Sequence, residues 1–121
     1  MNYFGCQNMV KPIKRILVKH PKNAYQNQEK INNEASELNY SGNPYFDKSC
    51  THFDLFIELL KSINCEIHYL PAENSSSIDS IYTHDPCLVS NAGAIYSNMG
   101  KLERSSEPDL IENYFKSIGV P

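Results

Sequence analysis

The apolar positions of the chain fall into short strand-like runs. "IKRILVKH" (Ile13–His20) combines apolar and basic residues and predicts a first strand that a proline ends. A second strand is predicted over Cys65–Pro71, where apolar and polar positions alternate. Two more strands, Ile81–Val89 and Ala94–Ser97, flank "SNAG" at Ser90–Gly93, which is typical of a hairpin turn.

Helical spacing predicts a helix over Thr51–Asn64 and another that starts near Ser106. In each case a hydroxyl residue is followed three positions later by an acid, Asp54 or Asp109, which favours capping of the N-terminus. Gly119 is the expected end of the last helix. The expected buried stripes are Phe53, Phe56, Ile57, Leu60 and Ile63 in the first helix, and Leu110, Ile111, Tyr114, Phe115 and Ile118 in the second.

The residues between the first strand and the first helix, Lys22–Ser49, are polar and rich in asparagine. No apolar period persists there, so a long loop is predicted, with one short helical piece at Glu29–Leu38. A second loop is predicted over Ala72–Asp79. The expected order is therefore β, loop, α, β, β, β, α, which indicates an α/β fold.

Composition and charge narrow the function classes. With 121 residues, 40% hydrophobic and 21% charged, the chain is one globular domain or a piece of one. A net charge of -3 gives no electrostatic case for binding nucleic acid or an anionic membrane surface. No apolar run is long enough to span a membrane, and the first residues lack the apolar core of a signal peptide. A cytoplasmic protein is expected.

The cysteines show no metal-binding or disulfide pattern. Cys6, Cys50, Cys65 and Cys87 are scattered without a C-x-x-C pair. In the cytoplasm they are expected to be reduced thiols, partly buried. Neither a metal nor a cofactor is expected.

Four polar residues could carry chemistry: Asp79, His84, Asp85 and Arg104. The two aspartates lie six positions apart, so on one extended strand they would share a face. Two carboxylates near one pocket suit a cationic ligand, and a guanidinium above all. His84 could act as a base or ligand, and Arg104 as an anion clamp. Taken singly, each also has a structural explanation: a loop cap, a hydrogen-bonded histidine, a turn before proline and a surface ion pair.

Taken together these segments resemble a known family. "GCQNMVKPIKRILVKHP" (Gly5–Pro21), "IHYLP" (Ile67–Pro71) and "DSIYTHDPCLVSNAGAIYSNMGKLERSSEP" (Asp79–Pro108) resemble, in this order, the start of guanidine-modifying enzymes. The greatest similarity is to the dimethylarginine dimethylaminohydrolase branch, beside arginine deiminases and amidinotransferases. It spans most of Gly5–Pro121 and is weakest over residues 22–49. "HDP" and "MGK–ER–E" are its most specific parts.

The resemblance implies a role for each matching residue. The acid at Asp85 would grip a substrate guanidinium, the acid at Asp79 and its neighbours would help hold the amino-acid end, and Arg104 would bind the substrate carboxylate. The dimethylarginine enzymes often carry Glu at the His84 position, and an imidazole would interact differently with an α-ammonium group. In this family a cysteine thiolate attacks the guanidinium carbon while a histidine handles protons and an acid orients the group.

The family fold is an α/β propeller (pentein) of five strand–strand–helix–strand modules, whose catalytic triad lies downstream of the matching region. This sequence ends at "SIGVP", and its four cysteines match no nucleophile position. The resemblance therefore implies a truncated propeller, with the first module and part of the second over residues 1–121. Such a chain would supply only the substrate-binding residues of a hydrolase that acts on arginine or a derivative. A second chain with the remaining blades would complete the enzyme. Two alternatives remain: a non-catalytic module that binds an arginine-like ligand, and an inactive remnant.

Overall fold

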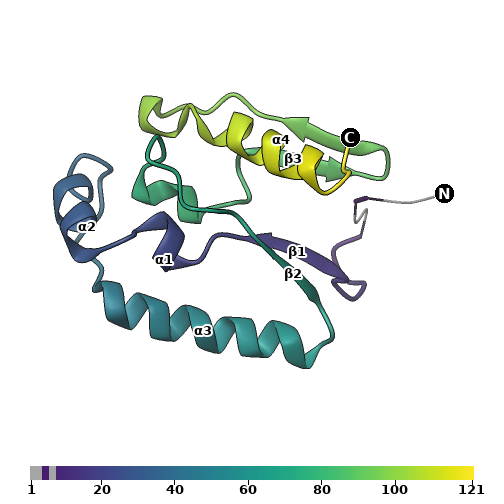
Figure 1. Ribbon diagram of the computed structural model, residues 1–121, viewed down its shortest axis with the longest axis horizontal. Coiled ribbons are helices and arrows are strands. Elements are labelled where there is room, and N and C mark those ends of the chain that lie inside the picture. Colours follow the sequence, from purple (N-terminus) through teal and green to yellow (C-terminus); the bar gives the residue numbers. More distant parts are fainter. Residues whose placement is uncertain (1–3, 6–7) are drawn as a thin grey trace.

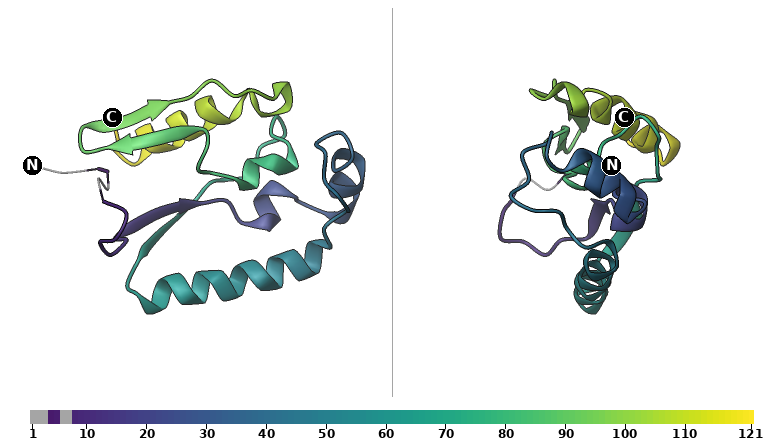
Figure 2. Two further views of the ribbon diagram at one scale, coloured as in Figure 1. Left: turned by 180° about the vertical axis from the view of Figure 1, so that it is seen from behind. Right: turned by 90° about the vertical axis from the view of Figure 1, so that its left-hand side faces the viewer.

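The computed structural model describes residues 4–5 and 8–121, so the prediction for Cys6 lies outside the described residues. The molecule has three layers, visible in Figure 1 and from two further sides in Figure 2. A two-stranded sheet of β1 (Arg15–Val18) and β2 (Glu66–Tyr69) lies between helices α3 (Phe46–Ser62) and α4 (Glu107–Ser117). The α/β class predicted from the sequence is confirmed.

The central sheet is parallel, with both faces covered, as parallel strands require. Both of its strands were predicted, although each is shorter than expected. The α3 side holds a cluster of Val18, Ile57, Leu60 and Cys65, with Ile16, Phe53 and Ile67 against it. The α4 side holds a cluster of Leu70, Ile111, Phe115 and Val120, against which Leu17 also packs. Successive β1 side chains thus alternate between the two layers.

Helix α3 starts five residues before its predicted start, so the capping prediction for Thr51 is wrong. The Thr51 hydroxyl instead donates to the carbonyl of Asp47 (3.1 Å) within the helix. The buried stripe is also narrower than predicted, because Phe56 is 42% exposed and Ile63 52% exposed.

The polar segment after β1 is not a long loop, which corrects the prediction for residues 22–49. It contains α1 (Pro21–Ala24), α2 (Gln28–Glu34) and the first turn of α3, and α2 confirms the short helical piece. Its sparse apolar residues form a cluster of their own, namely Ala24, Tyr25, Ile31, Ala35 and Leu38, together with Ile78. The Gln28 side chain closes the connection by donating to the carbonyl of Pro44 (2.9 Å) and accepting from the amide of Phe46 (2.8 Å).

The predicted strand over Ile81–Thr83 is wrong. Residues Ile78–Ile81 form a 3₁₀ helix, η1, and the strand β3 begins only at Cys87 and ends at Ser90. It pairs antiparallel with β4 (Gly93–Tyr96) across a two-residue turn, which confirms the predicted hairpin. A side chain at position 93 would collide with the carbonyl oxygen of Pro121, and the φ of +144° there also favours glycine.

A short 3₁₀ helix, η2 (Leu102–Arg104), leads into α4, whose start near Ser106 confirms the prediction. The expected cap is wrong, because the Ser106 hydroxyl donates to the carbonyl of Ser75 (3.2 Å) instead of an amide of its own helix. Gly119, with a φ of +81°, ends the helix as predicted. Ile118 is 41% exposed and so does not belong to the buried stripe. Among the described residues, no helix combines the length and apolar character needed to cross a bilayer.

Candidate functional site

Two segments distant in sequence meet at the candidate site: residues 79–85, from η1 onwards, and residues 101–107, from η2 into α4. Two ion pairs join them. Lys101 Nζ lies 3.0 Å from Asp79 Oδ2, and Arg104 Nη1 lies 2.9 Å from Asp85 Oδ2. We call this arrangement the paired-acid site. It brings three of the four predicted residues together.

The first pair has a buried acid and a more exposed base. The Asp79 side chain is 4% exposed and that of Lys101 is 45% exposed. Lys101 Nζ also donates to the carbonyl of Leu38 (3.1 Å). Asp79 lies on the 3₁₀ helix η1, so the expectation that it shares a strand face with Asp85 is wrong.

Further polar groups lie buried around Asp79. Burial and the nearby Asp79 carboxylate raise the pKa of Tyr40 far above its usual range, so this phenol stays neutral. The Ser80 hydroxyl is also buried, and it has no hydrogen-bond partner in the described part of the chain.

The second pair has the opposite arrangement, with a buried base. The Arg104 side chain is 10% exposed and that of Asp85 is 55% exposed. Nε and Nη2 of Arg104 donate to the two carboxylate oxygens of Glu107, both at 2.9 Å, and Nη2 also donates to the carbonyl of Tyr82 (2.9 Å). The hydrogen bonds that Arg104 donates, first to Glu107 and then to Asp85, outweigh burial and raise the pKa of Arg104 above its usual value.

His84 is exposed beside this pair. No hydrogen bond or ion pair of the His84 side chain appears among the contacts of the described residues. The paired-acid site therefore contains Asp79, Asp85 and Arg104 in two separate ion pairs that join the same two segments, with the exposed His84 next to Asp85 in the sequence.

Three charged residues of this region were missed from the sequence: Lys101, Glu107 and Lys19. The spacing of Arg104 and Glu107, three positions apart at a helix start, was a usable signal for their pairing. Lys19 follows β1 and is 3% exposed, and its Nζ donates to the Ser76 hydroxyl (3.1 Å). Burial lowers the pKa of Lys19, and the charge of Glu107 partly opposes this shift.

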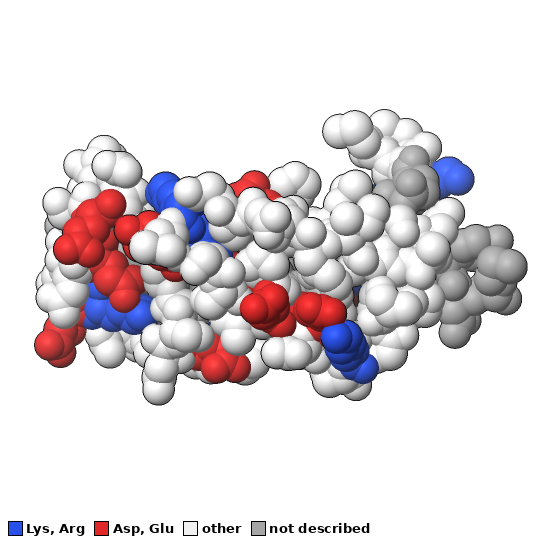
Figure 3. Space-filling view, turned by 90° about the horizontal axis from the view of Figure 1, so that it is seen from above, with Lys and Arg blue, Asp and Glu red and all other residues white. Residues whose placement is uncertain are grey.

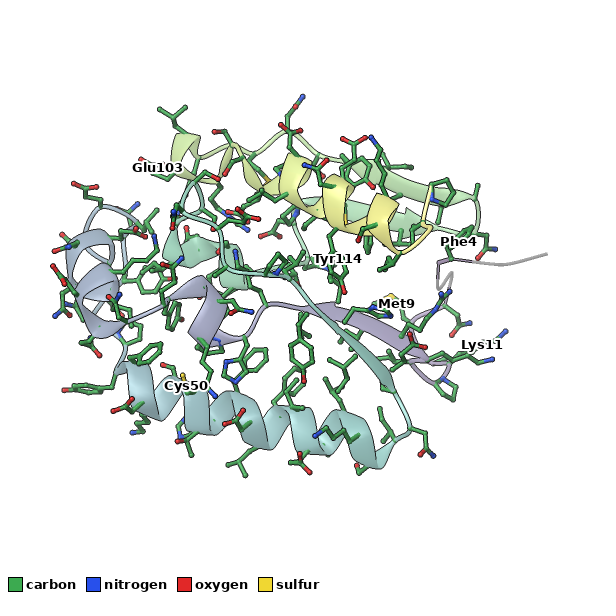
Figure 4. All side chains as sticks on the ribbon, viewed as in Figure 1. Phe4, Met9, Lys11, Cys50, Glu103 and Tyr114 are labelled. Atoms are coloured by element: carbon green, nitrogen blue, oxygen red, sulfur yellow. The ribbon has the colours of Figure 1, made fainter. Side chains whose placement is uncertain are left out.

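The described cysteines lack the lowered pKa that activates a nucleophilic thiol. Cys50, Cys65 and Cys87 are free thiols, and burial raises the pKa of each. Figure 4 shows Cys50 on the side of α3 that faces α1, whereas Asp79 lies on η1 and Arg104 on η2. Within residues 4–5 and 8–121, no group of three or more His, Cys, Asp or Glu side chains could hold a metal ion.

A shallow depression of about 250 Å³ lies next to the paired-acid site. Leu38, whose carbonyl binds Lys101, lines it. Its other lining residues are polar or charged: Lys30, Glu34, Glu37, Glu103 and the run Asn74–Ser77. In Figure 3 acidic side chains gather at the end of the molecule where α2 lies, with basic side chains among them.

Comparison with known proteins places this α/β arrangement in one fold class. No protein-family model matches the sequence, and no curated protein matches it. The fold is similar to part of dimethylarginine dimethylaminohydrolase, as seen in a crystal structure of that enzyme's adduct with 4-chloro-2-hydroxymethylpyridine. The TM-score is 0.67 at 22% sequence identity, over 90% of this chain and 38% of the enzyme chain.

Two further structures of the enzyme agree. A mutant in adduct with S-methyl-L-thiocitrulline gives a TM-score of 0.66 at 21% identity, covering 90% of this chain and 39% of that one. A mutant enzyme from Pseudomonas aeruginosa, complexed with citrulline, gives 0.71 at 22% identity, covering 92% and 40%. The resemblance seen in the sequence is thus confirmed at the level of the fold. The chain spans about two fifths of the length of these enzymes.

Proposed function

We propose that this chain supplies the substrate-binding residues of a hydrolase that cleaves a C–N bond of a linear amidine. The substrate would be arginine or a derivative, and the products a citrulline-type amino acid plus ammonia or an amine. The observation that carries the proposal is the paired-acid site, in which two carboxylates are each matched to a cation, in a chain with the fold of dimethylarginine dimethylaminohydrolase.

In this proposal Asp85 binds the substrate guanidinium and Asp79 holds the amino-acid end. Asp85 suits its role because its side chain is 55% exposed and already pairs with the guanidinium of Arg104. Arg104 would bind the substrate carboxylate. Four of its five N–H donors go to Glu107, Tyr82 and Asp85, which leaves one on Nη1 for a ligand. His84, which is exposed next to Asp85, would lie at the solvent side of this binding site.

The reaction needs a thiolate to attack the guanidinium carbon, a histidine to move protons and an acid to orient the group. The raised pKa values of Cys50, Cys65 and Cys87 disfavour a thiolate at each. We therefore propose that the triad lies outside this sequence, on a polypeptide that carries the remaining blades of the propeller. The chain would then represent the first module and part of the second. On the sequence grounds above, a cytoplasmic location is proposed as well.

The direct test is an assay of citrulline and amine release from L-arginine and methylated arginines. The chain alone is expected to release neither product. Mixed with a polypeptide that carries the missing blades, it is expected to release both, and Asp85→Asn should reduce that release. Citrulline formed by the purified chain alone would contradict the proposed division of the site.

A second candidate is a non-catalytic module that binds an arginine-like ligand. It is favoured by the fact that the paired-acid site is complete within this chain and needs no other polypeptide to satisfy its charges. Calorimetric titration with arginine and methylated arginines tests it. Binding without turnover, even after the missing blades are added, would support this candidate over the enzyme.

A further inference from the structure

The two acids of the paired-acid site are matched to chemically different cations. Asp79 holds an ammonium, Nζ of Lys101, at 3.0 Å, whereas Asp85 holds a guanidinium nitrogen, Nη1 of Arg104, at 2.9 Å. An ammonium is a compact point charge, while a guanidinium is a planar fork of donors. The chain itself therefore shows which kind of cation each acid accommodates.

The ammonium of Lys101 reaches Asp79 from the solvent side. Its side chain is 45% exposed, while the Asp79 side chain behind it is 4% exposed. Lys101 Nζ makes two contacts there, to Asp79 Oδ2 and to the carbonyl of Leu38 at 3.1 Å. A lysine on a flexible four-carbon stem can withdraw into water, whereas Asp79 cannot move out of the interior so easily.

From these contacts we propose that Lys101 is an internal stand-in for the α-ammonium group of the ligand, which must displace it from Asp79. This inference rests on the proposed function, because it takes the paired-acid site to bind an amino acid with a guanidinium side chain. The displaced contacts are well suited to an α-ammonium, which also carries three N–H donors. The Ser80 hydroxyl, buried next to Asp79 without a described partner, could accept from a third donor.

The consequence is a specificity rule. A ligand with an α-ammonium has to compete with Lys101, whereas one without it does not. L-arginine and 4-guanidinobutanoate form the matched pair of probes, because both have a guanidinium and a carboxylate and only arginine has the α-ammonium. Lys101 thus determines how strongly the site prefers one over the other.

The test is calorimetric titration of both probes into the full chain and into Lys101→Met, which keeps the length of the stem and removes the charge. L-arginine should bind Lys101→Met up to about fivefold more tightly, which corresponds to releasing one half-exposed ion pair. The affinity of 4-guanidinobutanoate should stay unchanged. Lys101→Gln, a polar replacement that still offers a donor to Asp79, should show a smaller gain for arginine and serves if the Met variant folds poorly. Lys116→Met is the control, since Lys116 pairs with Glu112 on α4.

The outcomes separate the two proposals. If 4-guanidinobutanoate binds but arginine gains nothing in either Lys101 variant, the stand-in inference is overturned and the proposed function stands. An arginine affinity that falls in the Lys101 variants also overturns it, because Lys101 would then help to hold the ligand. If neither probe binds any variant that circular dichroism shows to be folded, the proposed function fails and the inference fails with it.

Discussion

The two ion pairs of the paired-acid site have opposite patterns of burial. In the first, a buried acid, Asp79, meets a half-exposed base, Lys101, and in the second a buried base, Arg104, meets a half-exposed acid, Asp85. They differ in what remains when the exposed partner leaves. Arg104 keeps Glu107 at 2.9 Å, whereas the described ion pairs give Asp79 no carrier of positive charge other than Lys101.

This difference shows how the site can be both stable and open to a ligand. The pairing of Arg104 with Glu107 fixes the start of α4 against the Tyr82 carbonyl, and it leaves Asp85 free to change partners. Asp79 is instead a charge that always needs a cation, either from Lys101 or from a ligand. The predictions below test this asymmetry.

The largest effect is expected from Arg104→Met, which leaves Glu107, 3% exposed, as an unpaired buried charge. We expect the free energy of unfolding to fall by about 3–5 kcal/mol, as when one partner of a buried ion pair is removed. Urea denaturation measures it. The double variant Arg104→Met, Glu107→Leu should recover part of the loss, and a loss below about 1 kcal/mol in the single variant would contradict the assigned role.

Lys101→Met comes next, because it leaves Asp79 buried without its cation. The expected loss in the same denaturation experiment is about 2 kcal/mol, within the usual cost of an unsatisfied buried polar group. Asp79→Asn should cost less, since it leaves only a lysine that can turn into solvent. Equal losses for the two variants would show that burial of Asp79 does not control the pair.

Asp85→Asn is expected to have a small effect on stability, below about 1 kcal/mol, as for surface ion pairs in general. Arg104 keeps both oxygens of Glu107 in this variant, so no buried charge is left alone. A loss as large as that of Lys101→Met would remove the contrast between the two pairs.

The last prediction concerns a second buried base, Lys19, which has a serine hydroxyl rather than a carboxylate as its described hydrogen-bond partner. Burial lowers its pKa from the usual 10.5, so between the lowered pKa and 10.5 the unfolded chain binds more protons. The free energy of unfolding should therefore rise with pH in this window, as far as that one lysine contributes.

Denaturation at a series of pH values up to 10 measures this slope, with Lys19→Met expected to make it flatter than in the parent chain. Groups with raised pKa values oppose this rise: the thiols of Cys50, Cys65 and Cys87 once the pH exceeds their usual value of 9.0, and Tyr40 once it exceeds 10.0. The difference in slope between variant and parent chain isolates the contribution of Lys19. Lys61→Met, which changes an exposed lysine, is the control and should leave the alkaline rise in place. An unchanged slope in Lys19→Met would contradict the assignment.

The sequence predicted the elements whose pattern is local. β1, β2, the hairpin and α4 follow from alternation, turn residues and helical spacing, and the structure confirms them. The polar segment was misread because its core residues are few and widely spaced, yet Ala24, Ile31 and Ala35 are completely buried. Ile78 packs into the same cluster, and this contact, distant in sequence, favours a 3₁₀ turn where β-branched residues predicted a strand.

The candidate site, like the fold, could be predicted from the sequence only in part. Asp79, His84, Asp85 and Arg104 could be named from residue types and from the family resemblance, and their roles stay predictions. The partners Lys101 and Glu107 could not be assigned, because the choice of an ion-pair partner depends on where η1 and η2 meet in space. Lys19 gave no signal at all, since a lysine after a strand is ordinarily solvated.

The central claim is that this chain carries a binding site for a guanidino ligand in which Asp85 holds the guanidinium. Calorimetric titration of L-arginine into the full chain and into Asp85→Asn tests it most directly. The account predicts binding by the parent chain that weakens about tenfold or more in Asp85→Asn, because a hydrogen-bonded charge is lost, and that stays unchanged in Lys116→Met. Absence of binding by the parent chain, or equal binding by Asp85→Asn, would contradict it.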